Sequence, residues 1–301
     1  MSTPRITSGM VTRNIVSDLN DIATRVSHTQ QKMATGKELT RPSDDPFATG
    51  RAIGLRTELE GLGQYQRNVA DAASWTSVSD GALGTMGDIA QHASELLVRG
   101  ANGSASPADR VVIANEIDQL IGALKDTANA SYDGRSVFSG TATATAPYGA
   151  ASDAYLGDGG DVVRSIGPGV SVVVNARASD VLGNGADGKL LNTLRDISAH
   201  LKGGSAADMA ALTGSDLVAI DRSFDNVLTA QAQIGAIANR LETANDRLSE
   251  LELNTKTLLS QTEDADMAAT IVDYSMQQAV YQSALRAGAG IVQASLMDFL
   301  R

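Results

Sequence analysis

The chain contains no cysteine among its 301 residues. Disulfide bonds, thiolate metal sites and cysteine nucleophiles are therefore excluded. A chain without thiols also cannot be cross-linked by oxidation while it is unfolded, which is compatible with export of the unfolded protein.

Long apolar segments are also missing. No apolar run approaches the roughly 18 residues that a membrane-spanning helix needs, so we expect no membrane insertion. The N-terminus, Met1–Arg5, leads into residues 6–11 without the apolar core of a cleavable secretory signal. The sequence therefore leaves two locations open, the cytoplasm or an exterior reached by a route that reads no such signal.

Aromatic residues and positive charge are scarce. Aromatics make up 4% of the residues and hydrophobic residues 43%, so a core must be built from Leu, Ile, Val and Ala on helices. Lys and Arg number 24 against 35 Asp and Glu, which gives a net charge of -11 and a pI near 4.7. Phosphate binding needs clustered Lys and Arg, so this balance argues against nucleic acid as a partner. It favours a soluble chain that resists premature association.

Apolar heptads are present, and they lie at the two ends of the chain. Their steps alternate between four and three, which is typical of a narrow apolar stripe on a helix that packs against partner helices. The stripes are Ile15, Leu19, Ile22, Val26, Thr29 and Met33 at one end, and Ile237, Leu241, Ala244, Leu248, Leu251, Thr255, Leu258 and Thr262 at the other. Both ends therefore need partners, which indicates a protein built to assemble.

Turn and capping signals divide the chain into long predicted helices. Gly36 suits the end of a first helix, and the two prolines of residues 41–46 forbid its continuation. Ser106 and Pro107 can begin another helix, and Thr262 can cap a restarted one with acids in its first turn. The predicted helices cover about residues 8–35, 47–99, 106–134, 190–201, 215–262 and 263–301.

The pattern changes near residue 137. Residues 139–152 are small and rich in Thr and Ala, and β-branched runs at 162–163 and 170–174 follow among glycines. These features predict a small β module of hairpins. We therefore expect a mainly α fold with a small β insertion, in which both ends of the chain form a long antiparallel helical bundle or coiled coil, capped by a β-rich tip module.

Five segments follow from this pattern. They are a terminal assembly helix at 1–45, a helical rod at 46–137, a β-rich outer domain at 138–188, the return of the rod at 189–262 and a C-terminal assembly helix at 263–301.

Catalytic and metal-binding patterns are weak throughout. The three histidines, His28, His92 and His200, are far apart and match no metal spacing, so we interpret them as solvated helix positions. No HExxH, GxSxG or Walker A string occurs. Trp75 is interpreted as a core or interface anchor rather than a ligand-stacking residue.

Two glycine-rich strings have a chemical alternative that we reject. Residues 183–188 have the form GxGxxG, but the βαβ unit of a dinucleotide site is missing, so a loop is the better interpretation. Asp153, Asp158 and Asp161 could suggest a calcium turn, but they lack the EF-hand register and its terminal Glu. We expect a solvated hairpin turn there.

Several motifs, taken in order, resemble the flagellin superfamily. They are Arg5-Ile-Thr, MATGK at 33–37, PSDDPFA at 42–48, YDGRSVFSG at 132–140, AYLGD at 154–158, GVSVVVN at 169–175, EDADMA at 263–268 and SLMDFL at 295–300. Together they span nearly the whole chain, which makes the resemblance more specific than any single string. The double-proline turn, the Tyr-x-Gly-Asp motif and the C-terminal ending look most like the branch that joins the flagellar hook to the filament.

The resemblance implies a structural protein and not an enzyme, with no catalytic residue, cofactor or metal. Subunits of this branch are exported unfolded through the flagellar type III apparatus and form a ring at the hook tip. The implied partners are further copies of the chain, the first hook-associated protein, flagellin, and an export chaperone at the C-terminal segment. The implied location is extracellular, at the hook–filament junction. A flagellin, the filament subunit itself, is the alternative.

The resemblance also implies that the terminal helices are disordered in the free monomer and become ordered on assembly. Isolated heptad helices are marginal without partners, whereas burial of each Leu or Ile contributes about 1.5–3 kcal/mol. The expected assembly residues are Ile15, Leu19, Ile22, Val26, Tyr274, Tyr281, Leu285, Val292, Leu296 and Phe299.

Overall fold

The computed structural model describes residues 8–299, and the side chains of residues 10–290. The chain divides into two compact units. The terminal unit contains residues up to 61 and from 252, and the central unit contains residues 62–251. Two long helices, α2 (Pro46–Ala101) and α7 (Ser215–Glu263), have residues in both units.

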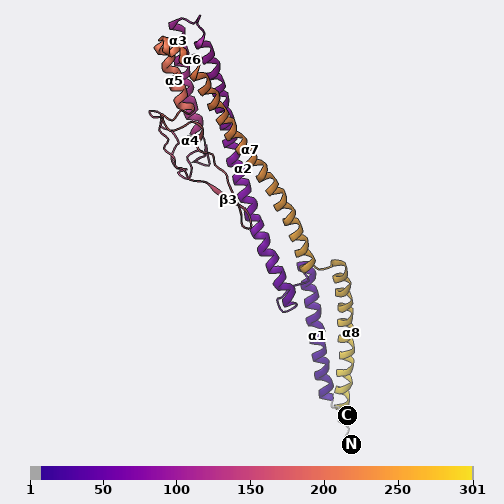
Figure 1. The fold of residues 1–301 in the computed structure, drawn as a ribbon. Coiled ribbons are helices and arrows are strands. Elements are labelled where there is room, and N and C mark those ends of the chain that lie inside the picture. The colour runs from indigo at the N-terminus through magenta and orange to yellow at the C-terminus, as the bar shows by residue number, and fades with distance from the viewer. Residues whose placement is uncertain (1–7, 300–301) are drawn as a thin grey trace. The chain divides into compact units, whose positions relative to one another are not determined.

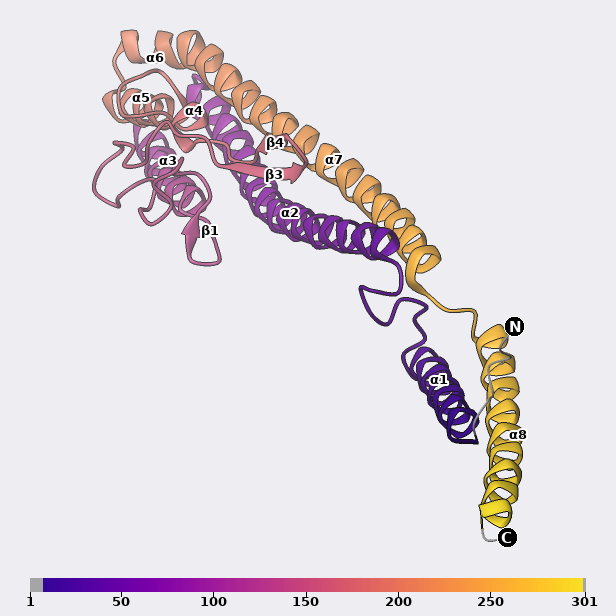
Figure 2. The same cartoon turned by 90° about the horizontal axis from the view of Figure 1, so that it is seen from below.

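In the terminal unit, helices from the two ends of the chain lie side by side. They are α1 (Ser8–Thr35) and α8 (Met267–Phe299), shown in Figures 1 and 2. Helix α1 ends at the predicted residue because Gly36 takes a left-handed φ of +68°. The predicted break before α8 is also present, but its capping residue differs. The carboxylate of Asp266 accepts from the amides of Ala268 and Ala269 at 2.9 and 3.1 Å, whereas the hydroxyl of Thr262 donates back to the Leu258 carbonyl.

In the central unit, the heptad faces of α2 and α7 form a buried seam. The buried stripe residues are Leu62, Val69, Leu83, Ala90 and Leu97 on α2, and Ile220, Val227, Ile234, Leu241 and Leu248 on α7. The seam would also accept an alanine at Gly87, because a Cβ there would make only ordinary contacts with α7. A Cβ at Gly87 would lie 3.8 Å from a methyl group of Val227.

Three shorter helices pack at one end of the α2–α7 pair. They are α3 (Pro107–Ala128), α5 (Leu190–Gly203) and α6 (Ala206–Thr213), and Figure 1 shows them together. Helix α3 begins as predicted, with a capping box between Ser106 and Asp109. It ends at Ala128, earlier than predicted, because the Asn129 side chain leaves the helix to exchange two hydrogen bonds with the backbone of Tyr148.

The β structure is smaller than the sequence predicts. In the described part of the chain, β1 (Ser131–Tyr132) pairs with β2 (Arg135–Ser136), and β3 (Val163–Gly167) pairs with β4 (Val170–Val173), both antiparallel. A short helix, α4 (Ala178–Val181), follows, and irregular backbone fills the rest of the insertion. The predicted fold class, mainly α with a small β insertion and long packed helices, is confirmed.

The expected place of the hairpin, at the tip, needs correction. The β3–β4 hairpin lies along α2 and α7 (Figure 2), where Asn68 donates to the Ser165 carbonyl at 2.9 Å and Arg164 pairs with Asp71 at 2.9 Å. The end of the α2–α7 pair is instead formed by α3, α5 and α6, where Gly100 faces the Leu201 side chain. Polar contacts from the hairpin to α2 therefore fix its position.

The aromatic anchor of the core is the predicted one. Trp75 is 1% exposed and meets Tyr132 edge to face, with ring centroids 6.3 Å apart. Such an edge-to-face pair adds to the stability that burial alone provides.

We expect Leu83→Ala to lower the free energy of unfolding by about 2–5 kcal/mol, because Leu83 is fully buried and its loss leaves a cavity. Urea unfolding followed by circular dichroism measures this. Val98→Ala on the same helix is the control, since Val98 is 57% exposed. Equal losses for the two variants would contradict the seam described for α2 and α7.

Candidate assembly interface

The α1–α8 pair brings together most of the described residues that the sequence marks for assembly. On α1, Ile15, Leu19, Ile22 and Val26 are half-buried. The buried or half-buried positions of α8 follow steps of four and three, and they are Thr270, Tyr274, Gln277, Tyr281, Ala284 and Gly288. Six of the ten predicted assembly residues therefore lie on these two stripes.

Two contacts fix the antiparallel register of this pair. The Thr29 hydroxyl donates to the Gln277 side-chain oxygen at 2.9 Å. Near the other end, a Cβ at Gly288 would lie 3.2 Å from Ile15 Cγ2 and 3.7 Å from Leu19 Cδ1. An alanine at this glycine would require Ile15 to shift by a few tenths of an ångström, so the lack of a side chain eases the close approach.

Helix α8 also presents apolar side chains that α1 does not cover. Leu285 is 44% exposed and lies away from the contact with α1. Val272, Met276 and Val280, spaced every four residues, are 66, 58 and 47% exposed on another side of the helix. The side chains of Val292, Leu296 and Phe299 lie outside the described residues. The role of all ten residues in assembly stays a prediction.

A cluster of charges, here called the clasp, joins the turn after α1 to the break before α8. The clasp consists of Lys37, Arg56, Glu263 and Asp264. Lys37 Nζ lies 2.6 Å from a carboxylate oxygen of each acid, and Arg56 pairs with the other oxygen of Glu263. Glu263 is only 4% exposed, so its two cationic partners offset the cost of burying its charge.

Backbone hydrogen bonds support the clasp. The Glu38 amide donates to the Glu263 carbonyl at 2.7 Å, and the Ala265 amide donates to the Gly36 carbonyl at 3.0 Å. Lys37 and Asp264 form an antiparallel bridge between them. Two segments that are more than 220 residues apart in sequence are thus held in one register.

The ion pair between Lys37 and Asp264 shifts both pKa values away from neutrality. The hydrogen bond to Asp264 raises the pKa of Lys37 above its ordinary value, and the hydrogen bond to Glu263 adds to this effect. Hydrogen bonding to Lys37 lowers the pKa of Asp264. Both groups are therefore charged across the neutral range, and the clasp is intact there.

The proline-rich turn after the clasp has a function for each of its aspartates. Asp45 Oδ1 accepts from the amides of Phe47 and Ala48, both at 2.9 Å, and so caps α2, whose first residue is Pro46. Desolvation works to raise the pKa of Asp44. Hydrogen bonds from the Arg41 amide, the Thr40 hydroxyl and His28 outweigh it and lower the pKa of Asp44 to about 2.

Each of the three histidines meets a carboxylate, and two of them differ from the sequence interpretation because they are half-buried. His28 Nε2 lies 3.3 Å from Asp44, and His92 Nε2 lies 3.3 Å from Glu116. His200 Nδ1 lies 2.6 Å from the buried Asp216. These pairs join separate segments of the chain. His92 is exposed on α2, as the sequence interpretation expects, whereas His28 and His200 are half-buried.

The aspartates of the insertion also have structural partners. Asp153 is not a hairpin-turn residue. Its carboxylate accepts from the buried Lys125 at 2.6 Å and from Arg195 at 2.9 Å. The hydrogen bonds from Arg195 are the main cause that lowers the pKa of Asp153. Asp158 accepts from the Thr141 amide at 2.6 Å and from the Gly160 amide at 3.0 Å. Sequence reasoning missed Lys125, whose only signal was a charge on an otherwise apolar helix face.

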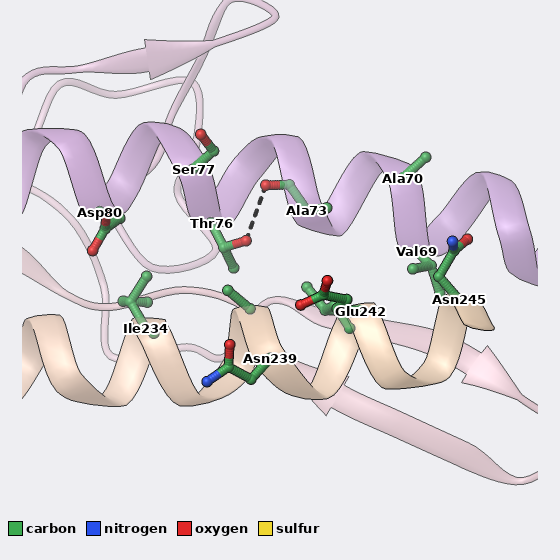
Figure 3. Close-up of a pocket in the computed structure, with 13 residues that line it drawn as sticks. Val69, Ala70, Ala73, Thr76, Ser77, Asp80, Ile234, Asn239, Glu242 and Asn245 are labelled. Carbon is green, nitrogen blue, oxygen red and sulfur yellow. Dashed lines mark hydrogen bonds between the residues drawn. The ribbon is translucent and has the colours of Figure 1, made fainter. Parts of the chain in front are cut away.

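The central unit has a shallow groove of about 600 Å³ between α2 and α7, shown in Figure 3. Small residues such as Ala73 and Thr76 line one wall, and Asn239 and Glu242 lie on the other. Among the described residues, no group of three or more His, Asp or Glu side chains could hold a metal ion. The GxGxxG string forms a loop, as interpreted, and it stands between α4 and α5.

No helix within the part of the chain that the structure describes is long and apolar enough to cross a membrane.

Comparison with protein families gives two matches. The family model for the bacterial flagellin N-terminal helical region matches residues 6–143, and the model for the bacterial flagellin C-terminal helical region matches residues 217–300. Together they cover well over half of the chain and include the helices of both terminal stripes.

Characterised relatives match over most of their length. Flagellar hook-associated protein 3 of Escherichia coli is 28% identical over 85% of this chain and 87% of its own. The protein of the same name from Salmonella typhimurium is 25% identical over 99% of this chain and 100% of its own length. The flagellin of Bacillus subtilis is 26% identical over 99% of this chain and 100% of its own length.

Solved structures match as well. A chain described as a flagellar hook-associated protein from Vibrio parahaemolyticus has a TM-score of 0.67 and 28% identity, and covers 73% of this chain and 100% of its own. Flagellar hook-associated protein 3 from Legionella pneumophila shares the fold, with a TM-score of 0.61 and 16% identity. The match covers 69% of this chain and 98% of that one.

The clasp predicts an acid-sensitive contribution to stability. The pKa of Asp264 is lowered in the folded protein, so its contribution is complete above the ordinary pKa and is lost as pH falls through the folded value. The pKa of Lys37 is raised, so its contribution is lost only at alkaline pH. Asp264→Asn should lower stability by less than about 1 kcal/mol at neutral pH, since both groups are partly exposed.

Thermal unfolding from neutral pH to about pH 3 measures this difference. The curves of the wild type and Asp264→Asn should converge as the pH falls. The exposed Asp196→Asn is the control and should follow the wild type. A constant gap between the wild type and Asp264→Asn at every pH would argue against the ion pair.

Proposed function

The chain belongs to the flagellin superfamily, and we propose on that premise that it is a structural subunit of the bacterial flagellum that joins the hook to the filament. The relatives named hook-associated protein 3 match it over most or all of their length. A solved hook-associated chain matches in sequence and in fold together. These relatives are structural flagellar proteins, which supports a structural rather than a catalytic role.

The observation that carries the proposal is the α1–α8 pair. A junction subunit must hold neighbours by surfaces that repeat from copy to copy, and helices from both chain ends supply such surfaces here. One face of α8 packs against α1, while Val272, Met276 and Val280 remain exposed. Exposed apolar side chains in a row are typical of a surface that another protein covers.

The partners proposed for these surfaces are further copies of the chain, the first hook-associated protein and flagellin. An export chaperone would cover the C-terminal segment before assembly, when its apolar residues have no neighbour. The terminal segments at 1–45 and 263–301 would be the assembly helices, and they would become ordered when neighbours bury their stripes. The assembled location would be outside the cell.

The similarity to flagellins keeps a filament subunit as the alternative, because both kinds of protein share the terminal helices. The two differ in what their loss does. A missing junction protein leaves the hook without a base for the filament, whereas a missing filament subunit leaves the rest of the junction in place.

Deletion of the gene should leave intact hooks and release full-length flagellin into the medium. Electron microscopy of the cells and immunoblotting of the medium measure this outcome. A plasmid copy of the gene is the control and should restore filaments. Short filaments that remain attached to the hooks would sink the junction proposal and favour a filament subunit.

Removal of residues 270–301 should prevent incorporation while the central unit stays folded, because its core does not include these residues. Purified protein added to isolated hooks from the deletion strain tests this without the export step. Circular dichroism checks that the truncated chain is folded, and the full-length chain is the control. Incorporation of the truncated chain at the hook tip would contradict the role of α8.

A further inference from the structure

A basic groove lies on the side of α1 that faces the proline-rich turn. It has a volume of about 610 Å³. Its lining consists of Asn20, Ala23, Thr24, Arg25, Ser27, His28 and Arg41. Among the described residues no carboxylate lines it, although acids outnumber bases in the whole chain. The charge of this lining is therefore opposite to the net charge of the protein, whereas the neighbouring pocket that Arg25 and His28 also line contains Glu38, Asp266 and Asp273.

The two guanidinium groups of the groove are not neutralised by acids in the described structure. Arg25 donates to the backbone carbonyl of Asp21 at 3.5 Å, and Arg41 donates to the neutral side chain of Gln31 at 3.5 Å. His28 differs, because Asp44 at the edge of the groove accepts from it. Arg25 and Arg41, both exposed, are therefore the cations that can receive an anionic partner.

A matching acidic row lies on α7. Glu242, Asp246 and Glu250 follow one another at intervals of four residues, and all three are exposed. Figure 3 shows the first of them, Glu242, at the groove between α2 and α7. Like charges four residues apart on one helix repel each other. In the described structure no ion pair relieves this repulsion, so the row is suited to a cationic partner.

The two surfaces also match in length. Glu242 and Glu250 are eight residues apart, which is about 12 Å along a helix. Asn20 and His28, which both line the basic groove, are also eight residues apart on α1. A helix laid along the groove could therefore place its acids near both arginines.

We propose that the acidic row of α7 in one copy of this chain docks into the basic groove of α1 in a neighbouring copy. The proposal rests on the proposed function, in which copies of the chain assemble at the junction. The contact joins two different surfaces, so each copy binds one neighbour through its acidic row and another through its basic groove. Repetition of the same step builds a ring or a helix. Exposed ion pairs add little affinity singly, so the contact sets the register between copies while the apolar stripes supply the binding energy.

Cysteine cross-linking tests the contact, because the natural chain has no cysteine to give a background. Two copies with different tags are expressed together in the deletion strain, one with Ser27→Cys and the other with Asp246→Cys. Isolated flagella are treated with a short bifunctional maleimide. A covalent dimer that carries both tags can form only between copies, and we expect it to be the main product.

The matched control replaces Asp246→Cys with Asp225→Cys, an exposed acid on the same helix outside the row. It should give no dimer. Cross-linking is scored in whichever flagellar fraction contains the protein, so the location tests the proposed function and the dimer tests the docking. Equal dimer yields for Asp246→Cys and Asp225→Cys, no dimer for either, cross-links to a different protein, or absence of the protein from flagella would overturn the docking.

Charge reversal gives a second test that separates docking from misfolding. Arg25→Glu with Arg41→Glu should abolish motility, and so should Asp246→Lys with Glu250→Lys. The four substitutions together should restore motility, because the pairing is recreated with the opposite signs. Failure of the combined variant, when circular dichroism shows it to be folded, would overturn the proposal.

Discussion

The buried carboxylate of Glu263 is the point on which the terminal unit depends. It lies where α7 ends, and Lys37 and Arg56 reach it from the turn after α1 and from the first part of α2. Since a buried charge without partners is costly, the meeting of these three segments avoids an uncompensated charge at Glu263. The backbone bonds on either side of Lys37 and Asp264 then fix the register from which α1 and α8 run together.

The composition explains why the helices can approach closely and why the terminal seam is thin. With 4% aromatics, the chain packs small side chains, and the absence of a side chain at Gly288 lets α1 and α8 approach closely. In the central unit the α2–α7 seam is completed by α3 and α5 and is fully buried at Leu83 and Leu97. The α1–α8 seam has only two helices, so its apolar residues on α1 are only half-buried.

Local signals predicted most helix ends, and long-range contacts account for the errors. Gly36 and Ser106 act through their own turns, so their helices begin or end as predicted. Helix α3 ends earlier than the sequence predicts because Asn129 bonds to Tyr148, a contact that no periodicity reveals. The clasp joins residues 226 positions apart and was missed for the same reason. The insertion looked β-rich, yet much of it is held by side chains such as Lys125 with Asp153. For the candidate site, the heptads predict the apolar contact between α1 and α8, but not the clasp that sets its register.

The antiparallel seam has a consequence for timing. Thr29 and Gln277, which share a hydrogen bond across it, are separated by 248 residues of chain. A polypeptide that emerges from a narrow channel one end first cannot close such a contact until nearly its whole length is outside. The central unit draws its contacts from residues 62–251 and can form before that moment. If the chain is exported through a channel, as the proposed function implies, the α1–α8 contact therefore forms last, and a partly exported subunit cannot yet assemble through it.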